Sequence, residues 1–169
     1  MIDEKTIREI ADRQAITEQL YRYCRSMDRR DIPLGHSVFH EDSHADYGEG
    51  SYIGSGRGFI DHVAELHTKN FDSHSHQITN ILINLDGNRA SSEAYVTVAL
   101  RYTRDGEPKL FRVWARYLDQ WSRREGHWAI DDRLLIIDVD ELRDLEPRSP
   151  KYRGARGPTD PSYAILGEA

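Results

Sequence analysis

The hydrophobic positions near the start of the chain recur at the spacing of one helical stripe. The stripe consists of Ile16, Leu20, Cys24 and Met27. Residues three or four apart lie on the same face of a helix, so the pattern predicts an amphipathic helix. Thr6 followed by Glu9 has the form of a capping box at its start. Pro33 opposes simple continuation of this helix, and a second short helix is expected from Leu34 to Phe39.

Polar residues dominate the next stretch, from His40 to Gly50, where a short strand is expected around His44 to Tyr47. The glycines that follow favour turns and predict a loop: Gly54, Gly56 and Gly58. Apolar residues then return to helical spacing. They predict a second long helix from Gly58 to Phe71.

From Ser73 onward the hydrophobic period changes to two, which is typical of strands. One face of the first strand would carry His74, His76, Ile78, Asn80 and Leu82. Three hairpin signals follow, at Asp86-Gly87, Asp105-Gly106 and Glu125-Gly126. They separate further predicted strands at Arg89–Thr103, Leu110–Ser122 and Trp128–Val139. Helices followed by an antiparallel meander predict an α+β fold, in which a curved sheet wraps around the N-terminal helices like a cone.

The predicted strand from Leu110 to Ser122 is apolar on both faces. One face carries Phe111, Val113, Ala115, Tyr117 and Trp121, and the other carries Leu110, Trp114 and Leu118. A strand that is apolar on both faces is covered on both. The helices supply one cover, and a second subunit is the simplest source of the other. We therefore expect a homo-oligomer, with dimer and trimer both open.

Length and composition narrow the class of protein further. The chain has 169 residues, which fits one domain, here residues 1–144. A net charge of -6 argues against nucleic acid as a partner, and no apolar stretch is long enough for a membrane helix. A cytoplasmic protein is expected. Four prolines in the tail, residues 145–169, predict irregular structure there. We expect this tail to lie across a neighbouring subunit.

Three motifs occur in a particular order along residues 5 to 140. They are Y-x-x-x-x-D from Tyr23 to Asp28, H-x-x-T-N from His76 to Asn80, and W-x-I-x-x-R-L from Trp128 to Leu134. Together they resemble the SnoaL-like branch of the nuclear-transport-factor-2-like superfamily. Within it the chain is most similar to dehydratase-like members: scytalone dehydratase, gamma-hexachlorocyclohexane dehydrochlorinase and bile acid 7-alpha-dehydratase. The resemblance implies an Asp–His pair that works without a cofactor.

The family's functional positions fall on particular residues of this chain. Its aspartate falls on Asp28, its histidine on His76 and its last-strand arginine on Arg133. Its tyrosines fall on Tyr23 and, less directly, on Tyr47. Substrate contacts are also expected from the neighbours of His76 on its strand face, His74 and Asn80.

Each of these residues also has a purely structural interpretation. Asp28 could simply turn to solvent at a helix end, and a histidine among apolar neighbours is often a satisfied core residue. Paired with a carboxylate, His76 becomes a general base near neutral pH. Arg133 would stabilise negative charge on a substrate, or form an ion pair at a sheet edge. Tyr23 could equally be a half-buried core residue.

Neither a metal nor an organic cofactor is expected. His74 and His76 lie two apart, and His40 and His44 lie four apart, but neither pair has a third ligand at a standard spacing. The glycine-containing loop lacks the spacing of a dinucleotide fingerprint. The preferred hypothesis is a cofactor-independent lyase acting on a small hydrophobic cyclic, polyketide-like or steroid-like molecule. A polyketide cyclase or ketosteroid-type isomerase remains open, as does a non-catalytic assembly subunit like the small subunit of ring-hydroxylating dioxygenases.

Overall fold

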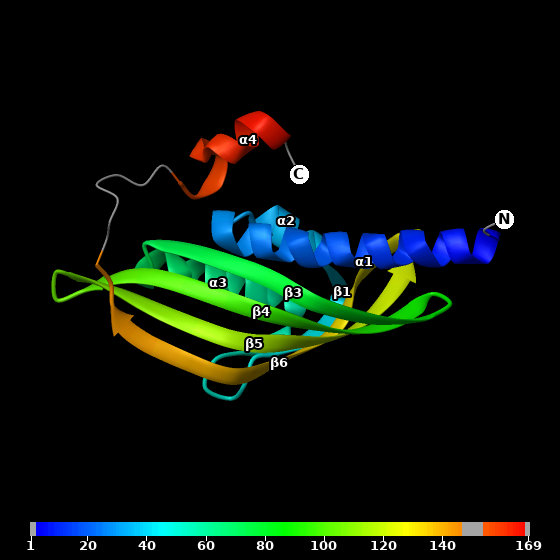
Figure 1. The fold of residues 1–169 in the computed structure, drawn as a ribbon, viewed down its shortest axis with the longest axis horizontal. Helices are drawn as coiled ribbons and strands as arrows, with labels where there is room; N and C mark the ends of the chain where they lie inside the picture. The colour runs from blue at the N-terminus through cyan, green and yellow to red at the C-terminus, as the bar shows by residue number, and fades with distance from the viewer. Residues whose placement is uncertain (1–2, 147–153, 168–169) are drawn as a thin grey trace.

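A computed structural model describes residues 3–146 and 154–167. The N-terminal helix α1 (Glu4–Arg29) runs along the concave side of a curved sheet (Figure 1). The predicted stripe is buried, since Ile16, Leu20, Cys24 and Met27 all belong to the core. The predicted capping box is wrong, because Asp3 caps the helix and its carboxylate accepts a hydrogen bond of 2.7 Å from the Thr6 backbone. A cap at Asp3 begins the helix one turn earlier.

Two further helices complete the layer that contacts the sheet. Helix α2 (Ile32–Ser37) begins before Pro33 rather than after it, and Asp31 caps it. Proline is tolerated in a first helical turn because the backbone N–H that it lacks has no intrahelical partner there. Helix α3 (Gly56–Asn70) is capped by Ser55 and starts inside the stretch expected to be a loop.

Six strands form one mixed sheet in the order β2-β1-β6-β5-β4-β3. The strands are β1 (Phe39–Asp46), β2 (Ile53–Ser55), β3 (Ser73–Asp86), β4 (Arg89–Arg104), β5 (Glu107–Arg124) and β6 (His127–Asp144). The predicted four-strand meander is confirmed in β3 to β6, and all of its pairs are antiparallel. The expectation of a wholly antiparallel sheet is wrong, because β1 pairs in parallel with β6. None of the described helices is long and apolar enough to cross a membrane.

Irregularities in the strands decide which residues face the helices. In β3 the pairing with β4 shifts between Thr79 and Leu82, and Asn80 has a φ of 50°. This bulge reverses the alternation, so His74, His76 and Ile78 face inward before it and Ile81 and Ile83 after it. The prediction that Asn80 and Leu82 share the face of His76 is therefore wrong, and both are exposed.

The tail is not irregular throughout. Its described part contains a 3₁₀ helix (Gly157–Thr159) and the helix α4 (Pro161–Leu166), which lie above α1 and α2 in Figure 1. The tail contacts its own chain rather than reaching away from it. Arg25 donates to Ser162 at 3.1 Å, Arg29 lies 3.4 Å from Asp160, and Tyr163 donates to Asp31 at 3.0 Å.

The bulge at Asn80 predicts an asymmetry between substitutions at this position. Asn80→Val should lower the free energy of unfolding by about 1–2 kcal/mol, because a β-branched residue is strained in the left-handed region. Asn80→Gly should be tolerated, and Thr79→Val on the neighbouring extended residue is the control. Urea denaturation measures all three variants, and an Asn80→Val protein as stable as the parent would contradict the bulge.

Candidate active site

The last turn of α1 and the first residues of β3 bring a carboxylate and an imidazole together. His76 Nδ1 lies 2.6 Å from Asp28 Oδ1. The backbone N–H of His76 also donates to both carboxylate oxygens, at 3.1 and 3.0 Å. The Asp28 and His76 side chains are 16% and 5% exposed, so solvent screens their interaction weakly. The sequence-based prediction that these two residues lie within hydrogen-bond distance is confirmed.

This geometry sets the tautomer of His76. An ionised carboxylate can only accept hydrogen bonds, so Nδ1 carries the proton that it donates to Asp28. The other ring nitrogen, Nε2, is then the unprotonated one and can accept a proton from another molecule. The carboxylate would stabilise the imidazolium that results.

Two neighbouring histidines remain neutral beside His76. Burial lowers the pKa of His74 to about 3 and that of His67 to about 4. Both ring nitrogens of His74 have partners: Nδ1 lies 3.3 Å from the carbonyl of Met27, and Nε2 lies 3.3 Å from Arg156. These partners leave His74 no free nitrogen for a substrate, and they fix the backbone two residues before His76.

Tyr23 and Tyr47 meet in the core under the sheet. Their hydroxyl oxygens lie 2.8 Å apart, and both rings are buried. Burial raises the pKa of each phenol well above its usual value, so both remain protonated donors. Tyr117 packs edge-on against both rings. The structure thus brings together the two tyrosines that the resemblance selects.

Arg133 is completely buried and paired with a residue that the sequence reasoning missed. Its Nε and Nη2 donate to the two carboxylate oxygens of Asp119 at 2.7 and 2.8 Å, and both side chains are 0% exposed. The guanidinium stacks on the rings of Tyr23 and Tyr117, at 4.3 and 4.0 Å from their centroids. Its remaining nitrogen, Nη1, is buried and has no hydrogen-bond partner among the described residues.

The predicted surroundings of Arg133 need correction. Alternation along the strand would place Asp131 on the same face, but a register shift next to Trp121 turns Asp131 towards Arg124 and Ser122 instead. Arg133 on β6 and Asp119 on β5 are opposite each other in the pairing of these two strands. Both strands are inside the sheet, so the ion pair does not lie at a sheet edge. The alternation of apolar residues was the signal in the sequence that could have identified Asp119, since it lies in phase between Tyr117 and Trp121, and the structure buries all three side chains.

The charges of Asp28 and Arg133 both affect the pKa of the buried Cys24 thiol. Burial and the Asp28 charge raise the pKa of the Cys24 thiol to about 12, while Arg133 acts in the opposite direction. Both charges therefore act on the same buried residue of α1.

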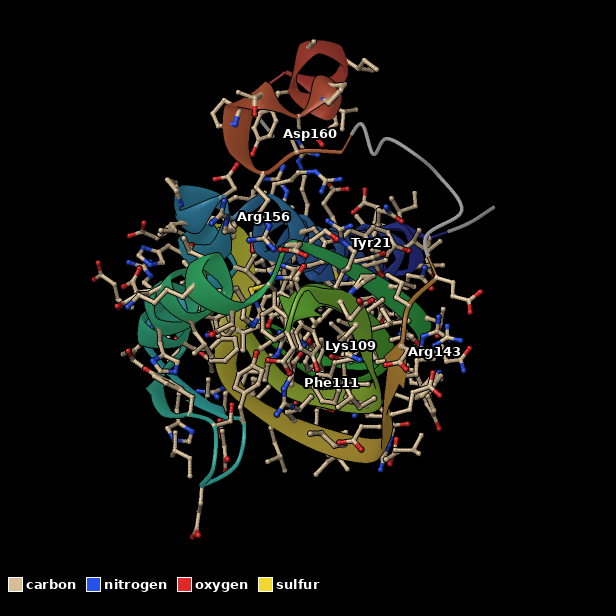
Figure 2. The ribbon with its side chains drawn as sticks, turned by 90° about the vertical axis from the view of Figure 1, so that its left-hand side faces the viewer. Tyr21, Lys109, Phe111, Arg143, Arg156 and Asp160 are labelled. Atoms are coloured by element: carbon tan, nitrogen blue, oxygen red, sulfur yellow. The ribbon has the colours of Figure 1, made fainter. Side chains whose placement is uncertain are left out.

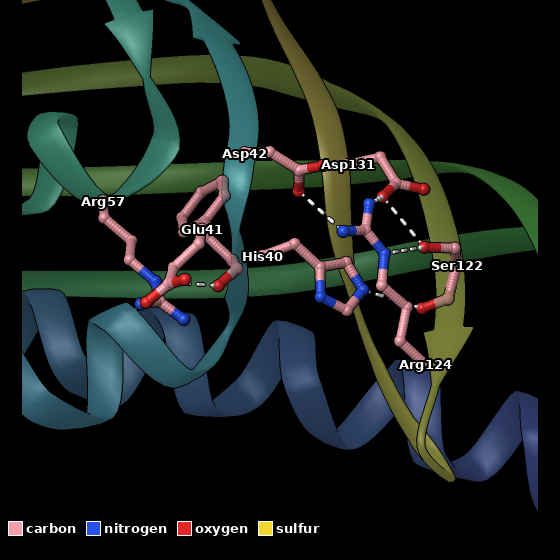
Figure 3. Close-up of polar contacts among 8 residues, drawn as sticks. His40, Glu41, Asp42, Arg57, Ser122, Arg124 and Asp131 are labelled. Carbon is pink, nitrogen blue, oxygen red and sulfur yellow. Dashed lines mark hydrogen bonds and ion pairs between the residues drawn. The ribbon is translucent and has the colours of Figure 1, made fainter.

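The polar stretch His40–His44 is used for structure. His40 lies 3.1 Å from the carbonyl of Ser122, and His44 lies 3.1 Å from Asp132 (Figure 3 draws the first contact). Arg124 joins Asp42 to Asp131 in the same view. Within the described residues, no group of three or more His, Cys, Asp or Glu side chains is placed to hold a metal ion.

Comparison with known proteins agrees with this architecture. The family model described as SnoaL-like domain matches residues 8–133. No curated protein matches the chain.

Three solved structures illustrate the similarity. One is a protein from Novosphingobium aromaticivorans classed as a scytalone dehydratase, with a TM-score of 0.69 and 20% identity over 95% of this chain and 97% of its own. Another is hexachlorocyclohexane dehydrochlorinase LinA-type3 from Novosphingobium barchaimii, with a TM-score of 0.69 and 18% identity over 82% and 97%. The third, from N. aromaticivorans, is classed as an aromatic ring hydroxylase, with a TM-score of 0.69 and 27% identity over 80% and 94%.

The buried pair of Arg133 and Asp119 predicts a strong coupling in stability. Asp119→Leu or Arg133→Met alone should lower the free energy of unfolding by about 3–5 kcal/mol, because each leaves one charge buried without its partner. The double variant should lose much less than the sum of the two. Urea denaturation of the four proteins in a double-mutant cycle measures the coupling, and additive losses would contradict the pairing.

Proposed function

The chain belongs to the SnoaL-like domain family and has the nuclear-transport-factor-2-like fold, and on this basis we propose that it is a cofactor-independent lyase of the dehydratase type. The observation that carries the proposal is the 2.6 Å contact between His76 Nδ1 and Asp28. It leaves Nε2 unprotonated and able to act as a base, with the ring held in one orientation by a carboxylate that stabilises its protonated form.

In the proposed reaction His76 Nε2 removes a proton from a carbon next to a carbonyl group. The electron pair left on carbon forms a double bond as the bond to a neighbouring hydroxyl oxygen breaks. The imidazolium returns the proton to that oxygen, which leaves as water, and neutral His76 is restored. Atoms and electrons balance without an added oxidant, reductant or co-reactant.

Negative charge develops on the substrate carbonyl during this elimination. Arg133 supplies a fixed positive charge, and its Nη1 is the donor that its other contacts leave free. Asp119 and the two tyrosine rings hold the guanidinium in place, so little reorganisation is needed when the charge forms. One of Tyr23 and Tyr47 donates its O–H to the other, so one protonated phenol of the pair is left to donate to the same carbonyl or to the leaving group.

The substrate class follows from the side chains that surround the pair. Ile78 and Val98 lie on the inner face beside His76, and Phe111 and Leu135 are also partly buried against the core. Apolar walls with a few polar groups favour a small hydrophobic molecule, either cyclic, polyketide-like or steroid-like. The names dehydratase and dehydrochlorinase, given to two of the similar structures, both describe eliminations.

Two alternatives share part of this support. A polyketide cyclase or ketosteroid-type isomerase would use the same proton abstraction and differ in the fate of the carbanion. A non-catalytic assembly subunit of an aromatic-ring oxygenase is the second class. The similarity to a structure classed as an aromatic ring hydroxylase favours this second class, at 27% identity.

Self-association is also part of the proposal. The outer face of the sheet carries Trp114 and Leu118 on β5, which are only partly buried, and exposed Leu134 and Val139 opposite them on β6. Tyr95 on β4 extends this apolar surface. A second copy of the chain would cover it, as a dimer or a trimer.

Light scattering tests the assembly. The expected result at micromolar concentration is a mass of at least twice 19.6 kDa. Val139→Lys should shift the mass towards the monomer, because it places a charge in the proposed interface, whereas Lys5→Gln on the exposed start of α1 should not. A parent protein that scatters as a monomer would refute self-association.

Turnover tests the catalytic pair. His76→Ala and Asp28→Asn should each lower kcat by about 10²–10⁴-fold on a panel of hydroxy-carbonyl compounds, because both remove a transition-state interaction. The two defects should not add, since the residues work as one unit. His44→Ala, which alters an exposed histidine also bonded to an aspartate, should retain the parent kcat.

Thermal melting of the same variants separates an enzyme from a binding or assembly subunit. An enzyme loses turnover in both variants while they remain folded. Full activity in both variants would remove the support for the Asp28–His76 mechanism. A folded parent protein with no turnover on the panel would favour the assembly subunit.

A further inference from the structure

A cleft of about 570 Å³ opens where the end of α1, the helix α3 and the tail meet. Its lining includes four basic residues, Arg29, Arg30, Lys69 and Arg156. Figure 2 shows Arg156 beneath the tail, close to the ends of the helices. Asp28 and His76 do not line this cleft, although Arg29 follows Asp28 directly and Arg156 contacts His74.

Two of the four basic residues are neutralised by acids. Lys69 lies 2.6 Å from Glu65, one helical turn earlier on α3. Arg29 lies 3.4 Å from the buried carboxylate of Asp160 in the tail. The other acid in the lining, Asp61, accepts from His36 at 2.9 Å. Each acid at the cleft is therefore engaged with a partner other than Arg30 or Arg156.

Arg156 is held by neutral groups only, within the described part of the chain. Its Nη1 donates to the carbonyl of His67 at 3.2 Å, and its Nη2 donates to the carbonyl of Phe71 and lies near His74. Its Nε is buried and has no hydrogen-bond partner there. The guanidinium is thus partly buried without an ion pair among the described residues, and the charge of Asp72, which pairs with Arg101, offsets only part of that cost.

Arg30 is the second cation without an acid. Among the described residues its hydrogen-bond partner is the hydroxyl of Thr68, at 2.6 Å from Nη1, and it forms no ion pair. Both arginines line the same cleft. Burial lowers the pKa of Arg156, repulsion from Arg30 lowers it further, and the charge of Asp72 acts in the opposite direction. An anion between them would replace this repulsion by two attractions.

We propose that this cleft binds the carboxylate or phosphate group of a small anionic molecule, with Arg30 and Arg156 as its two cationic ligands. Guanidinium groups match the planar carboxylate and the phosphate oxygens with several donors each. The chain as a whole has a net charge of -6, which disfavours the approach of an anion. The cleft concentrates positive charge, so an anion would bind there rather than elsewhere on the surface. Because Arg156 belongs to the tail, a bound anion would also stabilise the contact between the tail and the helices.

Calorimetric titration of the full chain tests the site. Sodium phosphate and sodium succinate are added in separate experiments, with chloride keeping the ionic strength constant. The expected result is saturable binding of at least one of them. Arg156→Gln and Arg30→Gln should each weaken that binding about tenfold or more, the cost of losing one charge-assisted hydrogen bond.

Arg143→Gln is the matched control, since Arg143 is an exposed arginine that lies far from Arg156 in Figure 2. Its affinity should equal that of the parent. If Arg156→Gln does not fold, Arg30→Gln still tests the site. This variant should fold, because the Arg30 side chain makes a single hydrogen bond in the described structure, to the hydroxyl of Thr68. The absence of saturable binding of both anions, or an equal loss in Arg143→Gln, would overturn the proposal. The readout is binding, so its failure is distinct from the failure of the proposed lyase activity.

Discussion

The burial of charge inside a curved sheet is the constraint on which the candidate site depends. Arg133 lies at the centre of the core with no solvent contact, and such a cation is tolerated only with a partner. Asp119 supplies it from the adjacent strand, and the tyrosine rings on either side fill the remaining space. These contacts fix the guanidinium, and its Nη1 has no hydrogen-bond partner among the described residues.

The same constraint accounts for the contacts between Asp28 and His76. A carboxylate near the C-terminal end of a helix faces the negative end of the helix dipole and needs compensation. The ring and the backbone N–H of His76 provide it together. The neutral imidazoles of His67 and His74 add no competing positive charge beside it, because burial keeps their pKa values low.

Strand irregularities connect the fold to the site. His76 faces inward before the bulge at Asn80. After the bulge the alternation is reversed, so Ile81 and Ile83 face the core. The register shift next to Trp121 places Arg133 inward although Asp131, two residues before it, points elsewhere. Bulges of this kind commonly lie next to active sites, where they redirect a single side chain.

The amino-acid sequence alone was enough to predict the main elements and the Asp28–His76 pair. Hydrophobic period, turn residues and motif spacing predicted α1, the four-strand meander and the contact between Asp28 and His76, because these depend on local patterns and a shared motif. The parallel pairing of β1 with β6, the partner of Arg133 and the placement of Asn80 were decided by the tertiary structure. Register shifts and contacts between distant segments set these features, and alternation along one strand carries no information about them. Arg30 and Arg156 line one cleft for the same reason, since they lie far apart in the sequence and only the tertiary structure brings them to it.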